Sequence, residues 1–222
     1  MTTDHFAGQV ASDPGRTVQA GYDALAPRFA DWMAGFADEP SERFIGVVAA
    51  RLGAGATVLD LGCGNGANAR RLAERFDVVG VDISDSQLRI ARAAAAEVTF
   101  VRADFGELDF PAETFDAVIA LYSVMHVPRA DHATLFAKIR RWLKSRGLFL
   151  ASLSHVGGPD RTEEWLGVEM FFSGFDAETN SRLLREAGFE LLVDEVVPMT
   201  GPAGEIAFLW VLARSVVDSQ RL

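Results

Sequence analysis

Residues 58–66 read VLDLGCGNG, and this stretch decides the fold class of the chain. The apolar residues around an aspartate predict a short buried strand, and three glycines follow it directly. Glycine allows a sharp turn and a close approach of the backbone to a ligand. Because a helix is predicted from residue 67, the order strand, glycine turn and helix is typical of a nucleotide-binding α/β sheet. Taken alone, the glycine run is equally compatible with a tight turn that binds nothing.

The chain on both sides of this stretch alternates short apolar strands with amphipathic helices. Strands are predicted over 57–61, 78–81, 98–102, 115–121, 148–152, 189–197 and 206–213, and helices over 67–75, 85–96, 129–144 and 177–187. The last two strands have no room for a helix between them, so they pair antiparallel at the sheet edge. The predicted fold is α/β, a doubly wound, mostly parallel seven-stranded sheet with an antiparallel last strand and an N-terminal helical cap.

Four segments divide the chain. Residues 1–16 are predicted to form a flexible tail, 17–53 the helical cap, 54–214 the main domain, and 215–222 a C-terminal tail. Within the cap, Pro27 is expected to break or restart a helix, and Phe36 belongs to the apolar stripe that continues after it. Ser41 is expected to cap a further helix that ends at Gly53.

An insertion at 155–175 is longer than the usual connection between a strand and a helix. It is predicted to be irregular and to cover the substrate, since it starts at the carboxyl end of a strand, where open α/β sheets bind ligands. Trp165, Phe171 and Phe172 are its predicted substrate contacts. The alternative is a surface insertion that these aromatic residues anchor to the core.

Composition limits the classes of function. The chain has 222 residues, 49% hydrophobic and 23% charged, with a net charge of −10, which excludes dominant disorder and disfavours nucleic acid as a partner. One cysteine and no apparent signal peptide predict a cytoplasmic protein. The longest apolar run, 117–125, is about half of what crossing a bilayer requires, so no membrane role is expected. The oligomeric state is left open.

Two aspartates indicate which ligand the glycine turn suits. Asp82 ends the next strand, 20 residues after Gly62, where a carboxylate accepts hydrogen bonds from both hydroxyls of an adenosine ribose. Its alternative role is a helix cap beside Ser84. Asp60 precedes the turn and would repel a pyrophosphate but attract the ammonium of an amino acid, while amides near 64–67 hold a carboxylate. S-adenosylmethionine is such a ligand, an adenosine joined to an amino acid without phosphate.

The stretches VLDLGCGNGANARRLAERF, VVGVDIS, ADF and FDAVIALYSVMHV resemble the class I S-adenosylmethionine-dependent methyltransferases, and the resemblance covers about residues 18–213. It implies that the glycine loop holds the methionine part, Asp82 the ribose and Ile83 the adenine. It also implies that Asp104 bonds the adenine amino group, with Phe105 beside the ring, and that Tyr22 closes over the cofactor. The alternatives are a turn former at Asp104 and a buried helix residue at Tyr22. The full set of implied cofactor contacts is Tyr22, Asp60, Gly62, Cys63, Gly64, Asn65, Gly66, Asp82, Ile83, Asp104, Phe105 and Leu121. Cys63 is expected there as a small residue and not as a nucleophile.

Two histidines are the candidate catalytic bases. His126 follows the fourth predicted strand and His155 the fifth, which places both at the carboxyl rim of the sheet. A structural role is the alternative for each. His5 lies in the predicted tail and His132 early in a helix, so neither is a candidate.

The predicted function is transfer of a methyl group from S-adenosylmethionine to an O, N, S or C atom of a small metabolite, by in-line displacement, with S-adenosylhomocysteine as product. The residues Leu121-Tyr122-Ser123-Val124 differ from the Asn/Asp-Pro-Pro-Tyr/Phe pattern of similar enzymes that methylate adenine, cytosine or glutamine, and they lack the carboxylates of magnesium-dependent catechol methyltransferases. Methylation of nucleic-acid bases and a metal are therefore not expected, and Tyr122 is a further substrate contact. Two alternatives remain: an S-adenosylmethionine-binding regulator without catalysis, and an NAD-dependent oxidoreductase, against which Asp60 and the missing Tyr-x-x-x-Lys pair argue.

Overall fold

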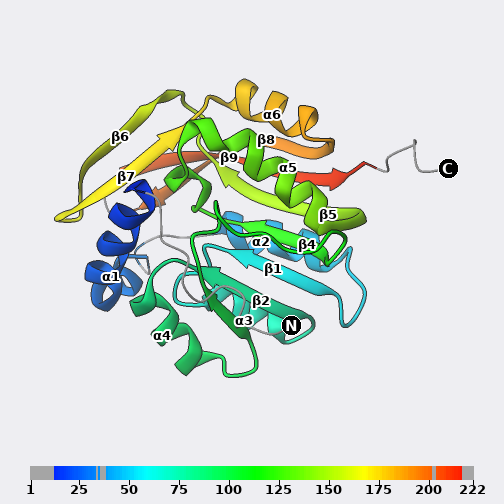
Figure 1. Ribbon diagram of the computed structural model, residues 1–222, viewed down its shortest axis with the longest axis horizontal. Coiled ribbons are helices and arrows are strands. Elements are labelled where there is room, and N and C mark those ends of the chain that lie inside the picture. Colours follow the sequence, from blue (N-terminus) through cyan, green and yellow to red (C-terminus); the bar gives the residue numbers. More distant parts are fainter. Residues whose placement is uncertain (1–12, 34, 36–38, 202–203, 217–222) are drawn as a thin grey trace.

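A seven-stranded sheet lies at the centre of the computed structural model, which describes residues 13–33, 35, 39–201 and 204–216 (Figure 1). The strands are β1 (Thr57–Leu61), β2 (Asp77–Asp82), β3 (Thr99–Arg102), β4 (Phe115–Ala120), β5 (Leu143–Leu153), β8 (Phe189–Gly201) and β9 (Gly204–Ser215). Their spatial order is β3-β2-β1-β4-β5-β9-β8. The first five strands are parallel, and β9 runs antiparallel to both β5 and β8. The predicted fold class is confirmed.

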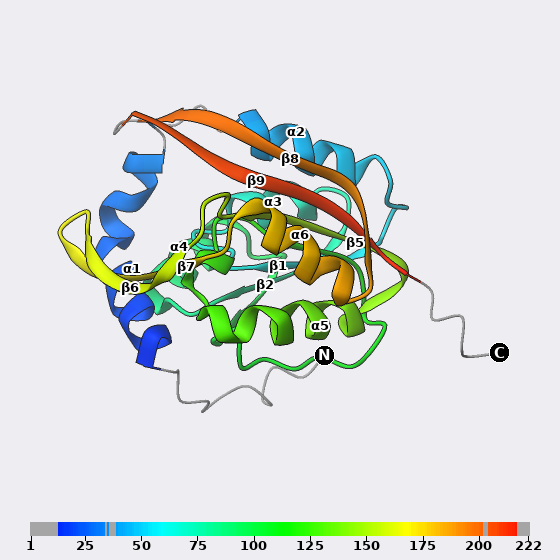
Figure 2. The same cartoon turned by 90° about the horizontal axis from the view of Figure 1, so that it is seen from above.

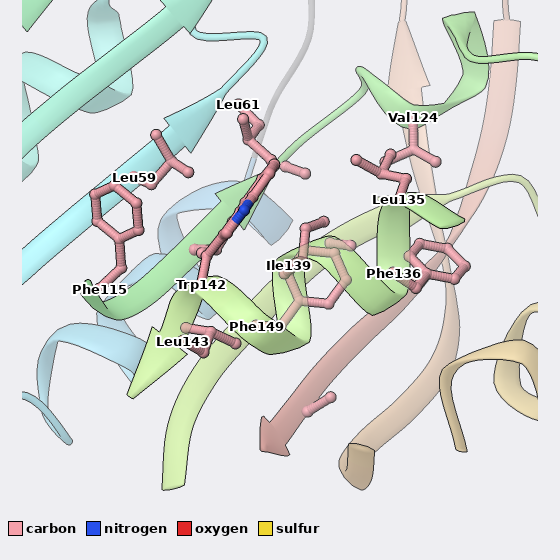
Figure 3. Close-up of a cluster of buried hydrophobic side chains, with 14 of the residues drawn as sticks. Leu59, Leu61, Phe115, Val124, Leu135, Phe136, Ile139, Trp142, Leu143 and Phe149 are labelled. Atoms are coloured by element: carbon pink, nitrogen blue, oxygen red, sulfur yellow. The ribbon is translucent and has the colours of Figure 1, made fainter. Parts of the chain in front are cut away.

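Helices cover both faces of the sheet because its strands are apolar on both sides. Val58 belongs to a buried cluster that includes residues of helices α2 (Glu39–Ala49), α3 (Ala67–Ala73) and α4 (Asp85–Ala94), whereas Leu59 belongs to a cluster that includes residues of α5 (His132–Trp142) and α6 (Ala177–Glu186). Figure 2 shows α2 and α5 on opposite sides of the sheet. Figure 3 shows the cluster that contains Leu59, where Trp142 of α5 lies near Leu61. Phe136 of α5 lies with its ring centroid 6.2 Å from that of Phe149.

The insertion at 155–175 is a β-hairpin, so the prediction of an irregular loop was wrong. Strands β6 (Gly158–Trp165) and β7 (Val168–Gly174) pair antiparallel around a two-residue turn at Leu166 and Gly167. Both turn residues have positive φ angles, 52° and 77°, as tight hairpin turns require. Leu-Gly is not one of the common sequence signals for such a turn, and the Gly-Gly-Pro start of the insertion is typical of loops.

Helix α1 (Asp13–Met33) continues through Pro27, so the predicted break was wrong. Its position is fixed on both sides of the proline: Asp23 accepts hydrogen bonds from α4, and Arg28 donates to the hairpin carbonyl of Leu166 at 2.6 Å. These contacts stabilise the helix despite the backbone hydrogen bond that proline removes. Figures 1 and 2 both show α1 beside β6 and β7 at one end of the sheet.

Several other boundaries also differ from the prediction. Ser41 lies inside α2, which begins at Glu39, and its Oγ lies 3.3 Å from the Tyr122 hydroxyl. The predicted helix 129–144 is a 3₁₀ turn over Arg129–Asp131 followed by α5, since residues from Leu143 onward join β5. The predicted tails overlap α1 from Asp13 and β9 at Ser215. The rest of the N-terminal tail with His5, Phe36, and residues 217–222 lie outside the described residues.

None of the helices in the described part of the chain is both long enough and apolar enough to span a bilayer.

Candidate active site

The glycines of residues 62–66 form the turn between β1 and α3. Gly62, Gly64 and Gly66 have φ angles of +76°, +54° and +78°, which side chains rarely adopt. A Cβ atom on Gly64 would meet no atom within 4 Å, so this glycine faces open space. The turn lines a cavity of about 230 Å³, which we call the glycine-loop cavity. A Cβ atom on Gly66 would instead lie 2.9 Å from Ala91, so Gly66 lets the turn pack on α4.

Backbone amides of this turn already have partners inside the protein. The amide of Gly64 donates to Asp82 Oδ2 at 2.8 Å, and that of Ala67 donates to Asn65 Oδ1 at 3.2 Å. The expected contact of these amides with a ligand carboxylate therefore stays a prediction. Cys63 is buried, and burial raises the pKa of its thiol well above the usual range, which agrees with its expected role as a small, unreactive residue.

Asp60 is the least compensated acidic group of the site. Its side chain is only 2% exposed, and its Oδ2 atom has no hydrogen-bond partner among the described residues. Burial, with a smaller contribution from the charge of Asp82, raises the pKa of Asp60 to about 7. A buried carboxylate without a partner is stabilised by a cation. Asp60 thus fits the ammonium group of an S-adenosylmethionine methionine moiety.

Asp82 ends β2 and holds the two turns that flank it. Its Oδ2 atom accepts from Gly64, and its Oδ1 atom accepts from the amide of Ser84 at 2.9 Å. Burial outweighs these hydrogen bonds and raises the pKa of Asp82 to about 6. The N-cap of α4 is Ser84, whose side chain accepts a hydrogen bond from the amide of Gln87, so the alternative role of Asp82 as a helix cap is filled by Ser84. Asp82 itself lines the glycine-loop cavity, as a ribose contact would.

A second cavity of about 290 Å³ adjoins the first, and we call it the side cavity. Ile83 and Phe105 line both cavities, so the two cavities share a wall. Asp104 lines the side cavity, and its Oδ1 atom accepts from the amide of Gly106 at 3.0 Å. Ile83, Asp104 and Phe105, which the resemblance places around the adenine, therefore all line the side cavity.

The predicted cofactor contacts fall into three groups. Tyr22, Gly62, Cys63, Gly64, Asn65, Asp82, Ile83, Phe105 and Leu121 line the glycine-loop cavity, Asp104 lines the side cavity, and Asp60 and Gly66 line neither.

Tyr22 and His126 form a hydrogen-bonded pair across the site. The Tyr22 Oη atom lies 3.0 Å from His126 Nε2, and His126 Nδ1 lies 2.8 Å from the Phe171 carbonyl oxygen. Because a carbonyl only accepts, Nδ1 donates to it, and Nε2 is left to accept from the Tyr22 hydroxyl. Burial lowers the pKa of His126 to about 4 and, with the charge of Asp82, raises that of Tyr22 well above its usual range. Both groups are therefore neutral at pH 7.

On the far side of this pair lies an aromatic cavity of about 180 Å³. Tyr22 and His126 line this cavity as well as the glycine-loop cavity, so the pair stands at the junction of the two. Of the predicted substrate contacts, Tyr122, Trp165 and Phe172 line the aromatic cavity. Tyr122 has a positive φ of 54°, an uncommon conformation for a residue other than glycine.

Two predicted residues do not face this junction. The Phe171 side chain belongs to a buried cluster with Val18 and Leu25 and lines neither the aromatic nor the glycine-loop cavity, whereas its carbonyl oxygen lies at His126. Its place follows from strand alternation, which turns neighbours such as Phe171 and Phe172 to opposite sides of β7. His155 lines a different cavity, of about 550 Å³, which borders the aromatic cavity at Met125, Phe172, Ile206 and Phe208, but His155 itself lines neither the aromatic nor the glycine-loop cavity.

Sequence reasoning missed several residues that shape the site, among them Asp23, Phe29, Met33 and Met125. Asp23 accepts from Ser84 Oγ at 2.6 Å and from the amide of Ser86 at 2.9 Å, which pins α1 to the turn after Asp82. Phe29, Met33 and Met125 line the aromatic cavity. The sequence signal for Phe29 was its place in a stripe of apolar residues at helical spacing. Such a stripe predicts that the residues are buried, but it does not predict which part of the protein they pack against.

Comparison with known proteins identifies the family of the chain. A family described as a methyltransferase domain matches residues 58–147. The O-methyltransferase resE of Aspergillus sclerotiorum is 32% identical over 206 residues, which cover 79% of this chain and 76% of that protein. Phosphoethanolamine N-methyltransferase 3 of Arabidopsis thaliana is 31% identical over 64% of this chain, and the chain spans only 30% of that protein's length.

Among solved structures, the 1,6-didemethyltoxoflavin-N1-methyltransferase of Burkholderia thailandensis, with bound 1,6-didemethyltoxoflavin and S-adenosylhomocysteine, is similar in fold. The TM-score is 0.72 at 23% identity, and the match covers 95% of this chain and 93% of that one. At this identity the similarity concerns the fold alone.

Proposed function

This chain belongs to the class I S-adenosylmethionine-dependent methyltransferases, and on that premise we propose that it transfers a methyl group from this cofactor to a small molecule bound in the aromatic cavity. One observation carries the proposal: the hydrogen-bonded Tyr22–His126 pair lines both cavities, where donor and acceptor would meet. The relative from Aspergillus sclerotiorum, named an O-methyltransferase, supports the same class of reaction.

Residues around the glycine-loop cavity would hold the cofactor. Asp82 would meet the ribose hydroxyls, and Ile83 with Phe105 the adenine ring. Asp60 lines neither the glycine-loop nor the side cavity but lies two residues before Gly62 of the turn, and its unpartnered Oδ2 atom would become the partner of the ammonium group. When bound, S-adenosylmethionine supplies a sulfonium with an activated methyl group. The task left to the protein is to orient the acceptor and exclude water, and orientation alone contributes up to roughly 7–11 kcal/mol in favourable cases.

Tyr22 and His126 would remove the acceptor's proton. As the structure has them, Tyr22 donates its hydroxyl proton to His126 Nε2, which leaves the Tyr22 oxygen able to accept. When an acceptor proton moves to that oxygen, the Tyr22 proton moves to Nε2; because the pKa of His126 is only about 4, the imidazolium held by the Phe171 carbonyl would be short-lived and would release its proton at pH 7. Such proton transfer contributes about 10²- to 10⁴-fold in rate. Of the two predicted bases we propose only His126, because it lines both the glycine-loop and the aromatic cavity and is hydrogen-bonded to Tyr22, whereas His155 lines neither of them.

Three substitutions test the proposal. Tyr22→Phe and His126→Gln are expected to lower kcat for transfer of a tritium-labelled methyl group by about 10²- to 10⁴-fold, measured over a panel of small phenols, enols and amines. His155→Gln is the matched control and should retain the wild-type rate. Calorimetry should show S-adenosylhomocysteine binding in all three variants. The proposal fails if the wild-type protein transfers no methyl group, and the assignment of the base fails if His155→Gln alone is inactive.

A further inference from the structure

Aromatic rings make up most of the wall of the aromatic cavity, and Trp165 is at their centre. Its ring centroid lies 5.2 Å from that of Trp32, 5.9 Å from that of Phe172 and 6.0 Å from that of Phe29. The corresponding interplanar angles are 86°, 87° and 63°. These rings come from α1 and the hairpin, two elements far apart in the sequence. Walls of this kind bind flat apolar rings through offset and edge-to-face contacts.

The charges around the aromatic cavity also limit which acceptors it can bind. Among the described residues that line the aromatic cavity, none is Asp, Glu, Lys or Arg. An ionised group moved into such a cavity loses its hydration and gains no opposite charge, which makes its binding strongly unfavourable. The one histidine among these described lining residues, His126, has both ring nitrogens engaged, by Tyr22 and by the Phe171 carbonyl. Neutral acceptors are therefore favoured over phosphorylated, carboxylated or cationic ones.

The Tyr22–His126 pair limits which kind of atom the enzyme would methylate. A relay that ends on a neutral imidazole is useful only when the attacking atom must lose a proton. A neutral amine attacks without such help, and a protonated amine brings a charge into the cavity. A phenol or enol oxygen has a proton to give and no charge before it reacts.

We propose that the acceptor is an uncharged, ring-containing molecule whose methylated atom is a phenol or enol oxygen. This inference rests on the proposed function. In the reaction the oxygen–carbon bond forms as the carbon–sulfur bond of the donor breaks. The hydroxyl proton moves to the Tyr22 oxygen, and the Tyr22 proton moves to His126 Nε2.

Calorimetry on protein saturated with S-adenosylhomocysteine tests the inference with three probes: naphthol, the corresponding hydroxynaphthoic acid, and phosphoethanolamine. Naphthol should bind at least about 100-fold more tightly than either anionic probe, because only the anionic probes lose the hydration of a charge. With the labelled cofactor, the wild-type protein should transfer a methyl group to naphthol. The Tyr22→Phe variant should lose this transfer, while its affinity for naphthol should stay within about 3-fold of wild type.

A charge introduced at the cavity rim gives a second, independent readout. Ile206 lines the cavity and is 38% exposed, so an arginine there has access to solvent. Ile206→Arg should improve binding of hydroxynaphthoic acid at least about 10-fold relative to naphthol. Ile90→Arg is the control, since Ile90 has the same exposure, 39%, but lies on α4 away from this cavity.

The outcomes separate the two proposals. If the wild-type protein binds hydroxynaphthoic acid or phosphoethanolamine as tightly as naphthol, or binds S-adenosylhomocysteine but not naphthol, the acceptor inference is overturned while methyl transfer to another molecule stands. If Ile206→Arg changes the two ring probes equally, the charge argument is overturned. If S-adenosylhomocysteine itself does not bind, the proposed function fails.

Discussion

Replacing Asp60 with asparagine should stabilise the protein in the absence of cofactor. The pKa of Asp60 is raised from its ordinary 3.8 to about 7, because burial disfavours the ionised form. Between these two pH values the folded protein binds more protons than the unfolded chain, so stability falls as pH rises from about 4 to about 7. Asp60→Asn has no ionised form and escapes this loss.

The size of the effect follows from the same two pKa values. A difference of about three pH units corresponds to about 4 kcal/mol at pH 8, and to about 1.5 kcal/mol at pH 5, where the loss is only partly complete. The gain in the free energy of unfolding on Asp60→Asn should therefore grow by about 2.5 kcal/mol between pH 5 and pH 8. Binding should change in the opposite direction, since the variant loses the partner of the ammonium. We expect S-adenosylhomocysteine affinity to fall about 10- to 100-fold.

Urea denaturation of both proteins at pH 5 and pH 8 measures the gain, and calorimetry measures the binding. Asp116→Asn is the matched control. The Asp116 carboxylate accepts from the amide of Thr57 at 2.9 Å and pairs with Lys144 at 2.7 Å, so its loss should not stabilise the protein at either pH. The reasoning is refuted if Asp60→Asn is less stable than the wild type at pH 8, or if its advantage does not depend on pH.

Two further predictions concern the position of α1. A Cβ atom at Gly21 would lie 2.6 Å from Met170 Cε and 3.0 Å from the Glu169 carbonyl oxygen, so Gly21→Ala should lower the free energy of unfolding, measured by urea denaturation, by about 1–3 kcal/mol. Gly46→Ala in α2 is the control, because no atom lies within 4 Å of its Cβ position, and it should raise the free energy of unfolding by up to about 1 kcal/mol. Equal effects of the two substitutions would contradict the packing argument. Asp23→Ala removes both acceptor contacts to α4 and should lower the free energy of unfolding by about 1–3 kcal/mol, while Asp23→Asn, which keeps an acceptor oxygen, should lose less; identical losses would show that hydrogen bonding there is not the cause.

Local sequence patterns were sufficient to predict the parallel half of the fold. The strand over Thr57–Leu61 was predicted with its observed bounds, because a buried parallel strand reads as a short apolar run between turn signals. Pairing of the last two strands was confirmed for a similar reason, since the short gap between them leaves no other connection. Errors arose where tertiary contacts outweigh local propensity, as at Pro27, or where the chain pairs with itself around an unusual turn, as at Leu166 and Gly167.

The two halves of the site differ in predictability for a physical reason. Residues such as Asp60 and Asp82 lie at the ends of adjacent parallel strands, so sheet topology alone brings them together once the strands are recognised. Tyr22 and His126 are 104 positions apart, and they meet only because α1 packs across the sheet end and against the hairpin. Helical spacing around Tyr22 predicts that it is buried, but neither its hydrogen bond to His126 nor the Phe171 carbonyl that sets the histidine tautomer has a local signal. Since a backbone carbonyl is present in every residue, the identity of the side chain at 171 carries no information about that contact, and the orientation of the proposed base could be learned only from the three-dimensional structure.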